Sequence, residues 1–85
     1  MDTTKLECWD IGYCSQIDED QFFGWLEKIP AVKNFYGKGR CLYLEVPSEL
    51  NETDLRELIA IFRRYKIDIK PLRQFLTQEN KDWFL

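Results

Sequence analysis

Histidine does not occur among the 85 residues of this chain. Its absence removes the commonest general base and a leading metal ligand together, and it makes a Ser–His or Cys–His nucleophile impossible. The three cysteines, Cys8, Cys14 and Cys41, contain no CxxC pair and make a poor zinc site without histidine. Carboxylates remain as candidates for catalysis, but acids clustered at the start of a helix are ordinary caps. We therefore predict that the protein is not an enzyme and binds no metal or cofactor.

Glycine and long apolar runs are also scarce. The four glycines lack the spacing of a dinucleotide-binding or P-loop signature. The longest apolar stretch, Leu58 to Phe62, falls far short of the roughly 18 residues that span a membrane, and no secretory signal follows Met1. We expect a cytoplasmic protein without membrane attachment, whose cysteines are buried or half-buried free thiols. A Cys8–Cys14 disulfide is disfavoured, because a straight strand would hold the two residues too far apart.

Aromatic and acidic residues are plentiful by contrast. Six Phe, four Tyr and three Trp accompany a hydrophobic fraction of 45%, which is enough to build one dense core and predicts a single domain over residues 1–85. The net charge of −3 is uneven, since residues 1–31 hold seven acidic against two basic side chains. An acidic amino-terminal third disfavours nucleic acid as a partner and favours a basic protein.

Apolar spacing and turn residues predict the secondary structure. A strand is expected over residues 5–13 and a helix over 18–29, with Asp18 as its cap and Pro30 closing it. Strand-like runs over 32–36 and 40–46 flank Gly37-Lys38-Gly39 and predict a hairpin. A longer helix is expected over 51–66, capped by Asn51.

The tail after residue 66 has two interpretations. Residues 66–70 alternate and are compatible with a fourth strand. Alternatively, Asp68 caps a third helix in which Ile69, Leu72, Phe75 and Leu76 share one face, and we favour this interpretation because the apolar spacing is helical. Trp83 and Phe84 are expected to pack back onto the domain.

The fold class that follows is α+β, a two-layer sandwich. An antiparallel sheet of three, possibly four, strands has helices packed on one face, in the order β-α-β-β-α followed by a helix or a strand. A fourth strand would make the arrangement ferredoxin-like. On the other face of the sheet we expect Leu6 and Cys8 from the first strand and Cys41 and Tyr43 from the third.

Residues 38–45 occupy the place that the RNA-binding run of RNA-recognition motifs takes in a βαββα order. Only Lys38 and Gly39 fit that pattern, and the positions that should supply stacking aromatics hold other residues. We interpret the segment as a hairpin and expect no nucleic-acid binding here.

These features together predict a non-catalytic protein-binding module, specifically a bacterial immunity-type inhibitor that masks a basic toxin such as a nuclease. Its expected contact residues are acidic and aromatic side chains: Asp10, Asp18, Glu19, Asp20, Phe23, Tyr43 and Glu45. One alternative is an adaptor or regulatory subunit that acts through homo- or hetero-oligomerisation. A weaker alternative is an RNA- or DNA-binding domain that uses the basic residues between Arg63 and Arg73.

Overall fold

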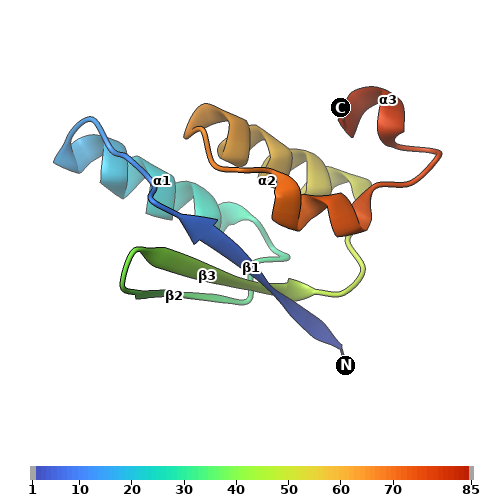
Figure 1. Ribbon diagram of the computed structural model, residues 1–85, viewed down its shortest axis with the longest axis horizontal. Helices are drawn as coiled ribbons and strands as arrows, with labels where there is room; N and C mark the ends of the chain where they lie inside the picture. Colours follow the sequence, from blue (N-terminus) through green and yellow to red (C-terminus); the bar gives the residue numbers. More distant parts are fainter. Residues whose placement is uncertain (1, 85) are drawn as a thin grey trace.

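The computed structural model describes residues 2–84 as one α+β unit (Figure 1). The elements in chain order are β1 (Thr3–Trp9), α1 (Gln16–Lys28), β2 (Asn34–Lys38), β3 (Cys41–Pro47), α2 (Glu52–Arg64), the 3-10 helix η1 (Lys70–Phe75) and the short helix α3 (Lys81–Phe84). The predicted order β-α-β-β-α followed by a helix is confirmed.

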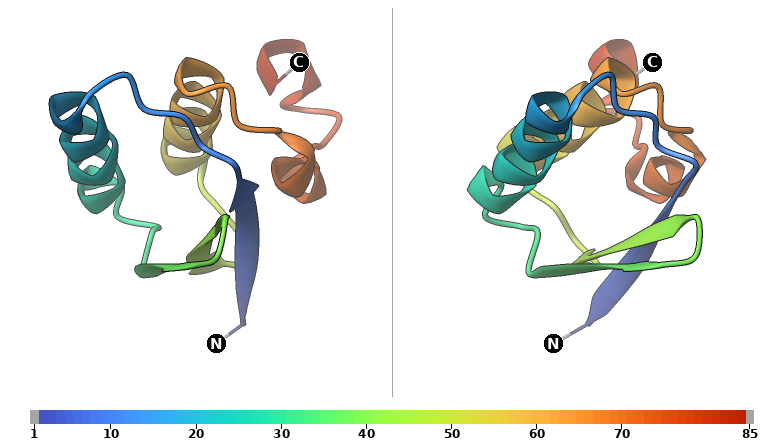
Figure 2. Two further views of the ribbon diagram at one scale, coloured as in Figure 1. Left: turned by 60° about the vertical axis from the view of Figure 1, so that its left-hand side comes forward. Right: turned by 90° about the vertical axis from the view of Figure 1, so that its left-hand side faces the viewer.

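The three strands form one antiparallel sheet in the order β1-β3-β2, so that β3 is central and β1 and β2 are the edges. Helices α1 and α2 lie side by side over one face of this sheet (Figures 1 and 2). No element described in residues 2–84 covers the opposite face (Figure 2). The architecture is therefore the predicted two-layer sandwich, with one face of its sheet open.

Strand β1 is shorter than predicted and its side chains point the other way. It ends at Trp9 because Asp10 adopts a φ of 53° and turns the chain, while the Asp10 N–H donates to the Arg40 carbonyl. Leu6 and Cys8 are fully buried in the core rather than on the open face. Opposite residues of an antiparallel pair share a face, and the register sets Leu6 opposite Leu44. The apolar face of β3 therefore decides the orientation of β1.

Helix α1 begins earlier than predicted, because Ser15 rather than Asp18 is its cap. The Ser15 Oγ accepts the N–H of Asp18 at 3.1 Å, and the Asp18 carboxylate in turn accepts the N–H of Cys14 at 2.8 Å. The spacing of Phe22, Trp25, Leu26 and Ile29 predicts one buried stripe, of which Phe22, Leu26 and Ile29 are buried and Trp25 is only partly buried. Ring contacts of 4.8 Å to Tyr65 and 5.4 Å to Tyr13 make Phe22 the centre of an aromatic cluster between the helices and the β1–α1 connection.

Helix α2 and the hairpin follow the predictions closely. Asn51 caps α2 as expected, since its Oδ1 accepts the N–H of Asp54 at 2.8 Å. The hairpin turn is tighter than predicted, because Gly37 and Lys38 still belong to β2 and the chain reverses at Gly39 and Arg40. Gly39 has a φ of 62°, the left-handed region in which glycine is favoured.

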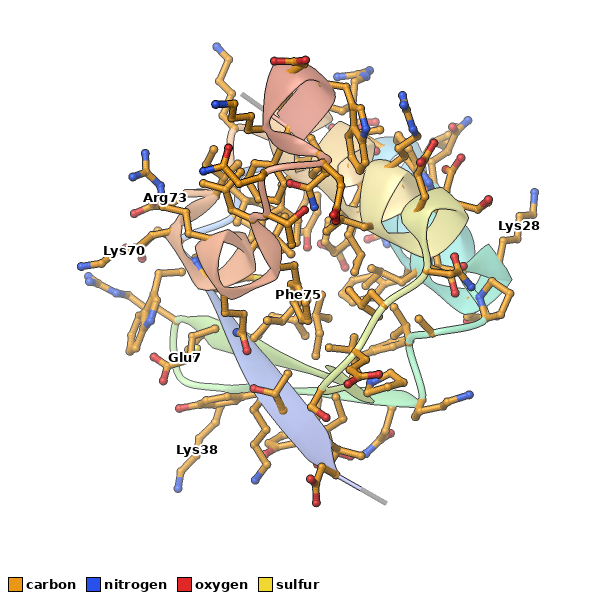
Figure 3. The ribbon with its side chains drawn as sticks, turned by 90° about the vertical axis from the view of Figure 1, so that its right-hand side faces the viewer. Glu7, Lys28, Lys38, Lys70, Arg73 and Phe75 are labelled. Atoms are coloured by element: carbon orange, nitrogen blue, oxygen red, sulfur yellow. The ribbon has the colours of Figure 1, made fainter. Side chains whose placement is uncertain are left out.

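The alternative of a fourth strand over residues 66–70 is wrong, and helical turns occupy the tail as favoured. The prediction that Asp68 caps the tail helix is also wrong, because η1 begins after Ile69 and has no side-chain cap. The Asp68 carboxylate accepts the N–H of Lys70 at 2.9 Å just before η1. Leu72 and Phe75 are buried, and Figure 3 shows Phe75 directed inward while Lys70 and Arg73 point away from the domain. Helix α3 then returns Phe84 to the core, where its side chain is fully buried.

All three cysteines are free thiols, but only Cys8 and Cys41 are buried, and the exposed Cys14 departs from the prediction. None of the helices in residues 2–84 has the length and apolar character needed to cross a bilayer.

Candidate protein-binding surface

The face of the sheet opposite the helices, called here the open face, presents alternate residues of all three strands. The side chains on this side are those of Lys5, Glu7, Trp9, Asn34, Tyr36, Lys38, Cys41, Tyr43 and Glu45, of which Cys41 is buried. The register arranges them in rows across the sheet, so that Tyr43 on β3 stands between Glu7 on β1 and Tyr36 on β2. Figure 3 shows Lys38 projecting away from the helices on this side.

Aromatic rings form the middle of the open face. The rings of Tyr36 and Tyr43 stack with centroids 5.2 Å apart, and the Lys5 ammonium lies 5.7 Å from the centre of the Tyr36 ring. Trp9 is 52% exposed, and its indole N–H donates to Glu7 at 3.1 Å. Large exposed rings are costly to leave in water and are enriched where proteins bind one another.

Charged side chains surround these rings and nearly cancel one another. The positive charges of Lys5 and Lys38 balance the negative charges of Glu7 and Glu45, and Lys5 lies opposite Glu45 in the register. The Asn34 amide donates to Glu45 at 3.3 Å. Hydrogen bonding to Cys41 is the first cause that raises the pKa of Tyr43. The open face is an aromatic patch within a mixed polar rim.

The residues predicted from the sequence as a single site fall into two groups. Tyr43 and Glu45 lie on the open face. The remaining five, Asp10, Asp18, Glu19, Asp20 and Phe23, lie where β1 passes into α1, at the end of the molecule that also carries the β2–β3 turn (Figure 1). We call this second region the hairpin end.

Most of the acids at the hairpin end are not neutralised by salt bridges. Asp10 is the exception and is neutralised, because its carboxylate lies 2.9 Å from the Arg40 guanidinium. Asp18, Glu19 and Asp20 form no salt bridge within residues 2–84. The hydrogen bond from the Cys14 N–H, together with the charge of Arg64, holds the pKa of Asp18 below its ordinary value. These three carboxylates therefore carry negative charge into solvent.

Phe23 is a packing residue rather than an exposed anchor. Its ring stacks on Phe35 at 5.5 Å and meets Phe22 at 5.2 Å and Tyr13 at 6.2 Å. One edge of the Phe23 ring borders a hollow at the hairpin end, whose lining also includes Asp10. The side chain supports the surface without projecting from it.

The sequence alone did not identify four residues of the open face: Trp9, Tyr36, Lys5 and Glu7. The expectation that Leu6 and Cys8 lie on the uncovered side of the sheet implies that Trp9, an odd-numbered neighbour in the same strand, faces the core. The signal that identifies it lies on another strand: Leu42, Leu44 and Val46 define the core side of β3, and pairing apolar with apolar residues fixes β1.

Comparisons with known proteins give no match: no protein-family model fits the chain, and neither a curated protein nor a solved structure is significantly similar to it. Within residues 2–84, no three His, Cys, Asp or Glu side chains are placed together as metal ligands.

Proposed function

We propose that this protein is a non-catalytic protein-binding module that acts in the bacterial cytoplasm as an immunity-type inhibitor of a basic toxin, such as a nuclease. The observation that carries the proposal is the open face, which no described helix covers (Figure 2) and on which the rings of Trp9 and Tyr36 are exposed and that of Tyr43 is partly exposed. Aromatic residues near the centre of a polar rim are typical of the hot spots of protein interfaces.

The size of the open face indicates that a partner also contacts neighbouring regions. Three strands about 4.8 Å apart and roughly 23 Å long present only about 300 Å² of sheet. A stable interface buries about 800 Å² on each partner. The hairpin end shares one end of the molecule with the β2–β3 turn, but Asp18, Glu19 and Asp20 stand in the helix layer, across the sheet from the open face (Figures 1 and 2). Their charges would therefore act on a partner by long-range attraction.

A basic toxin fits this combination of an aromatic face and a separate acidic region at the start of α1. A nuclease binds phosphates and therefore displays positive potential at its active site. The exposed carboxylates at the start of α1 would accelerate encounter with that surface, and the aromatic rings would hold the complex once formed.

The test uses the protein encoded beside the gene for this chain, which the proposal expects to be a basic toxin domain. The wild-type chain should bind that domain one to one and block its activity. Trp9→Ala and Tyr36→Ala should each raise Kd about 30-fold, which corresponds to the roughly 2 kcal/mol of a hot-spot residue. Calorimetry and a nuclease assay measure both effects.

Ile17→Ala is the matched control, because Ile17 is a large apolar side chain that is 71% exposed on α1 and lies off the open face. It should bind like the wild type. The combined variant Asp18→Asn, Glu19→Gln, Asp20→Asn should associate more slowly and with less dependence on salt. The proposal fails if the Trp9 and Tyr36 variants bind and inhibit normally, or if the neighbouring gene product is not bound.

A single-stranded nucleic acid is a second candidate ligand, because Trp9 and Tyr36 from other strands lie on the same face as Tyr43 and give the open face several rings for stacking. Exposed aromatics on a sheet stack bases in RNA-recognition motifs. The charge disfavours this candidate, since Lys5 and Lys38 are offset by Glu7 and Glu45 on the same face. Retention of fluorescent oligonucleotides at moderate salt, lost in Tyr36→Ala, would favour nucleic acid over a protein partner.

A further inference from the structure

The outer edge of β1 is open, and its backbone groups lack partners in the described chain. Strand β1 pairs only with β3. The Asp10 N–H donates to the Arg40 carbonyl, and the Asp2 carbonyl accepts from the Ser48 N–H, so even-numbered residues turn their backbone groups toward β3. The N–H and C=O groups of Thr3, Lys5, Glu7 and Trp9 consequently point away from the sheet. An edge of this kind is a template for another strand.

Space exists along this edge. A groove of about 490 Å³ lies between the side chains of Lys5, Glu7 and Trp9 and those of Asp68, Lys70 and Pro71 at the start of η1. Figure 3 looks onto this side of the molecule and shows η1 beside the end of β1. The groove follows β1 along Lys5, Glu7 and Trp9 and is bounded on its other side by the start of η1.

We infer that the strand that fits this edge is β1 of a second copy of this chain, paired antiparallel about a two-fold axis at Leu6. In an antiparallel ladder, a residue whose backbone N–H and C=O point toward the new strand must lie opposite a residue of that strand whose N–H and C=O point back. The register centred on Leu6 satisfies this rule. It sets Lys5 of each copy opposite Glu7 of the other copy, so the two-fold symmetry produces this pair two times.

Charge selects this register over its neighbours. A shift of the axis to Lys5 brings two lysines together, and a shift to Glu7 brings two glutamates together, and like charges directly opposite each other are destabilising. The other edge of the sheet offers no such match, since Lys38 is the only charged residue of β2 and Gly37 interrupts its side chains. Strand β1 is complementary to itself.

The dimer joins the two sheets into one of six strands and places the two open faces on the same side. It depends on the edge of β1 and not on what the open face binds. The failure of the toxin-inhibitor proposal would therefore leave it intact, and its own failure would leave that proposal intact.

Charge reversal at the two positions tests the inference. The wild type should sediment at twice the 10.3 kDa chain mass as its concentration rises from micromolar to millimolar. Lys5→Glu alone and Glu7→Lys alone should each weaken dimerisation at least about tenfold, because every opposite-charge pair becomes a like-charge pair. An equimolar mixture of the two variants should form a mixed dimer that native mass spectrometry identifies, because all its cross-strand pairs are again opposite.

Lys38→Glu is the control, since Lys38 lies on the open face but on the other edge strand. It should dimerise like the wild type, whereas association through the open face would be altered by it. Circular dichroism verifies that each variant is folded. A wild type that stays monomeric up to millimolar concentration overturns the inference, and so does a mixture that forms no mixed dimer.

Discussion

Aromatic side chains in this protein either pack within the domain or lie on its uncovered face, and Phe23 and Tyr43 illustrate the two cases. The sequence placed both at a binding surface. In the fold, Phe23 contacts three other rings, whereas Tyr43 stacks on Tyr36 alone and lies on the uncovered side of the sheet. Phe23 in α1 and Tyr43 in β3 look alike in sequence, because both are aromatic residues close in the chain to charged residues.

The two positions should therefore respond differently to the same substitution. Phe23→Ser should lower the free energy of unfolding by about 2–3 kcal/mol, somewhat less than the 3–5 kcal/mol typical of a fully buried Phe. Tyr43→Ser should lower it by less than about 1 kcal/mol. Urea denaturation at neutral pH measures both, and equal losses would contradict the assignment of Tyr43 to a presenting role.

The thiols show the same division. Burial is the main cause that raises the pKa of Cys8 to about 12, so this thiol stays protonated at neutral pH, whereas the side chain of Cys14 is exposed to solvent. Residue type alone carries no information on which cysteine a fold buries.

Elements differ in how far their own sequence specifies them. Helix α2 was predicted well because its cap Asn51 and its apolar stripe all lie within the helix. Strand β1 was oriented wrongly because its side-chain direction is set by Leu42 and Leu44, more than thirty residues away in the chain. Likewise, the hydrogen bond of Asp68 to Lys70 predicts a turn but not that a 3-10 helix follows it.

The site follows from the same limit. The acids at the start of α1 were found from sequence because their spacing is local. The open face was not found from sequence, because its rows combine residues of three strands. The wrong orientation of β1 placed Leu6 and Cys8 on this face instead of Lys5, Glu7 and Trp9.

The start of α1 also gives a pH prediction. The pKa of Asp18 is lowered in the folded protein, chiefly by the Cys14 N–H, so its ionised form stabilises the fold above its ordinary pKa, and this stabilisation is lost as the pH falls through the folded value. Asp18→Asn should therefore flatten the loss of stability below about pH 4. Urea unfolding at a series of pH values measures the slope, with Asp20→Asn as the exposed control. An unchanged slope in Asp18→Asn would contradict the assignment.

At the scale of the whole molecule, the tail completes the core. Phe84 is fully buried, its carbonyl accepts from the Arg63 guanidinium at 2.6 Å, and the neighbouring Trp83 ring lies 4.1 Å from the Arg56 guanidinium. These contacts attach α3 to α2.

Phe84→Ala should accordingly lower the free energy of unfolding by about 3–5 kcal/mol, a large part of the roughly 5–15 kcal/mol that stabilises a domain. Lys81→Ala, an exposed change in the same short helix, should alter it by less than about 0.5 kcal/mol. Chemical denaturation compares the two variants. Similar small effects would show that α3 is dispensable for the fold.

The burial of both Leu6 and Phe84 in one core has a consequence for synthesis on the ribosome. The segment that becomes β1 emerges without a strand to pair with until residues 41–47 have followed it. Phe84, a fully buried ring of the same core, is made later still. The nascent chain therefore carries unsheltered apolar side chains while the residues between Leu6 and Phe84 are synthesised, a period in which chaperones would engage it.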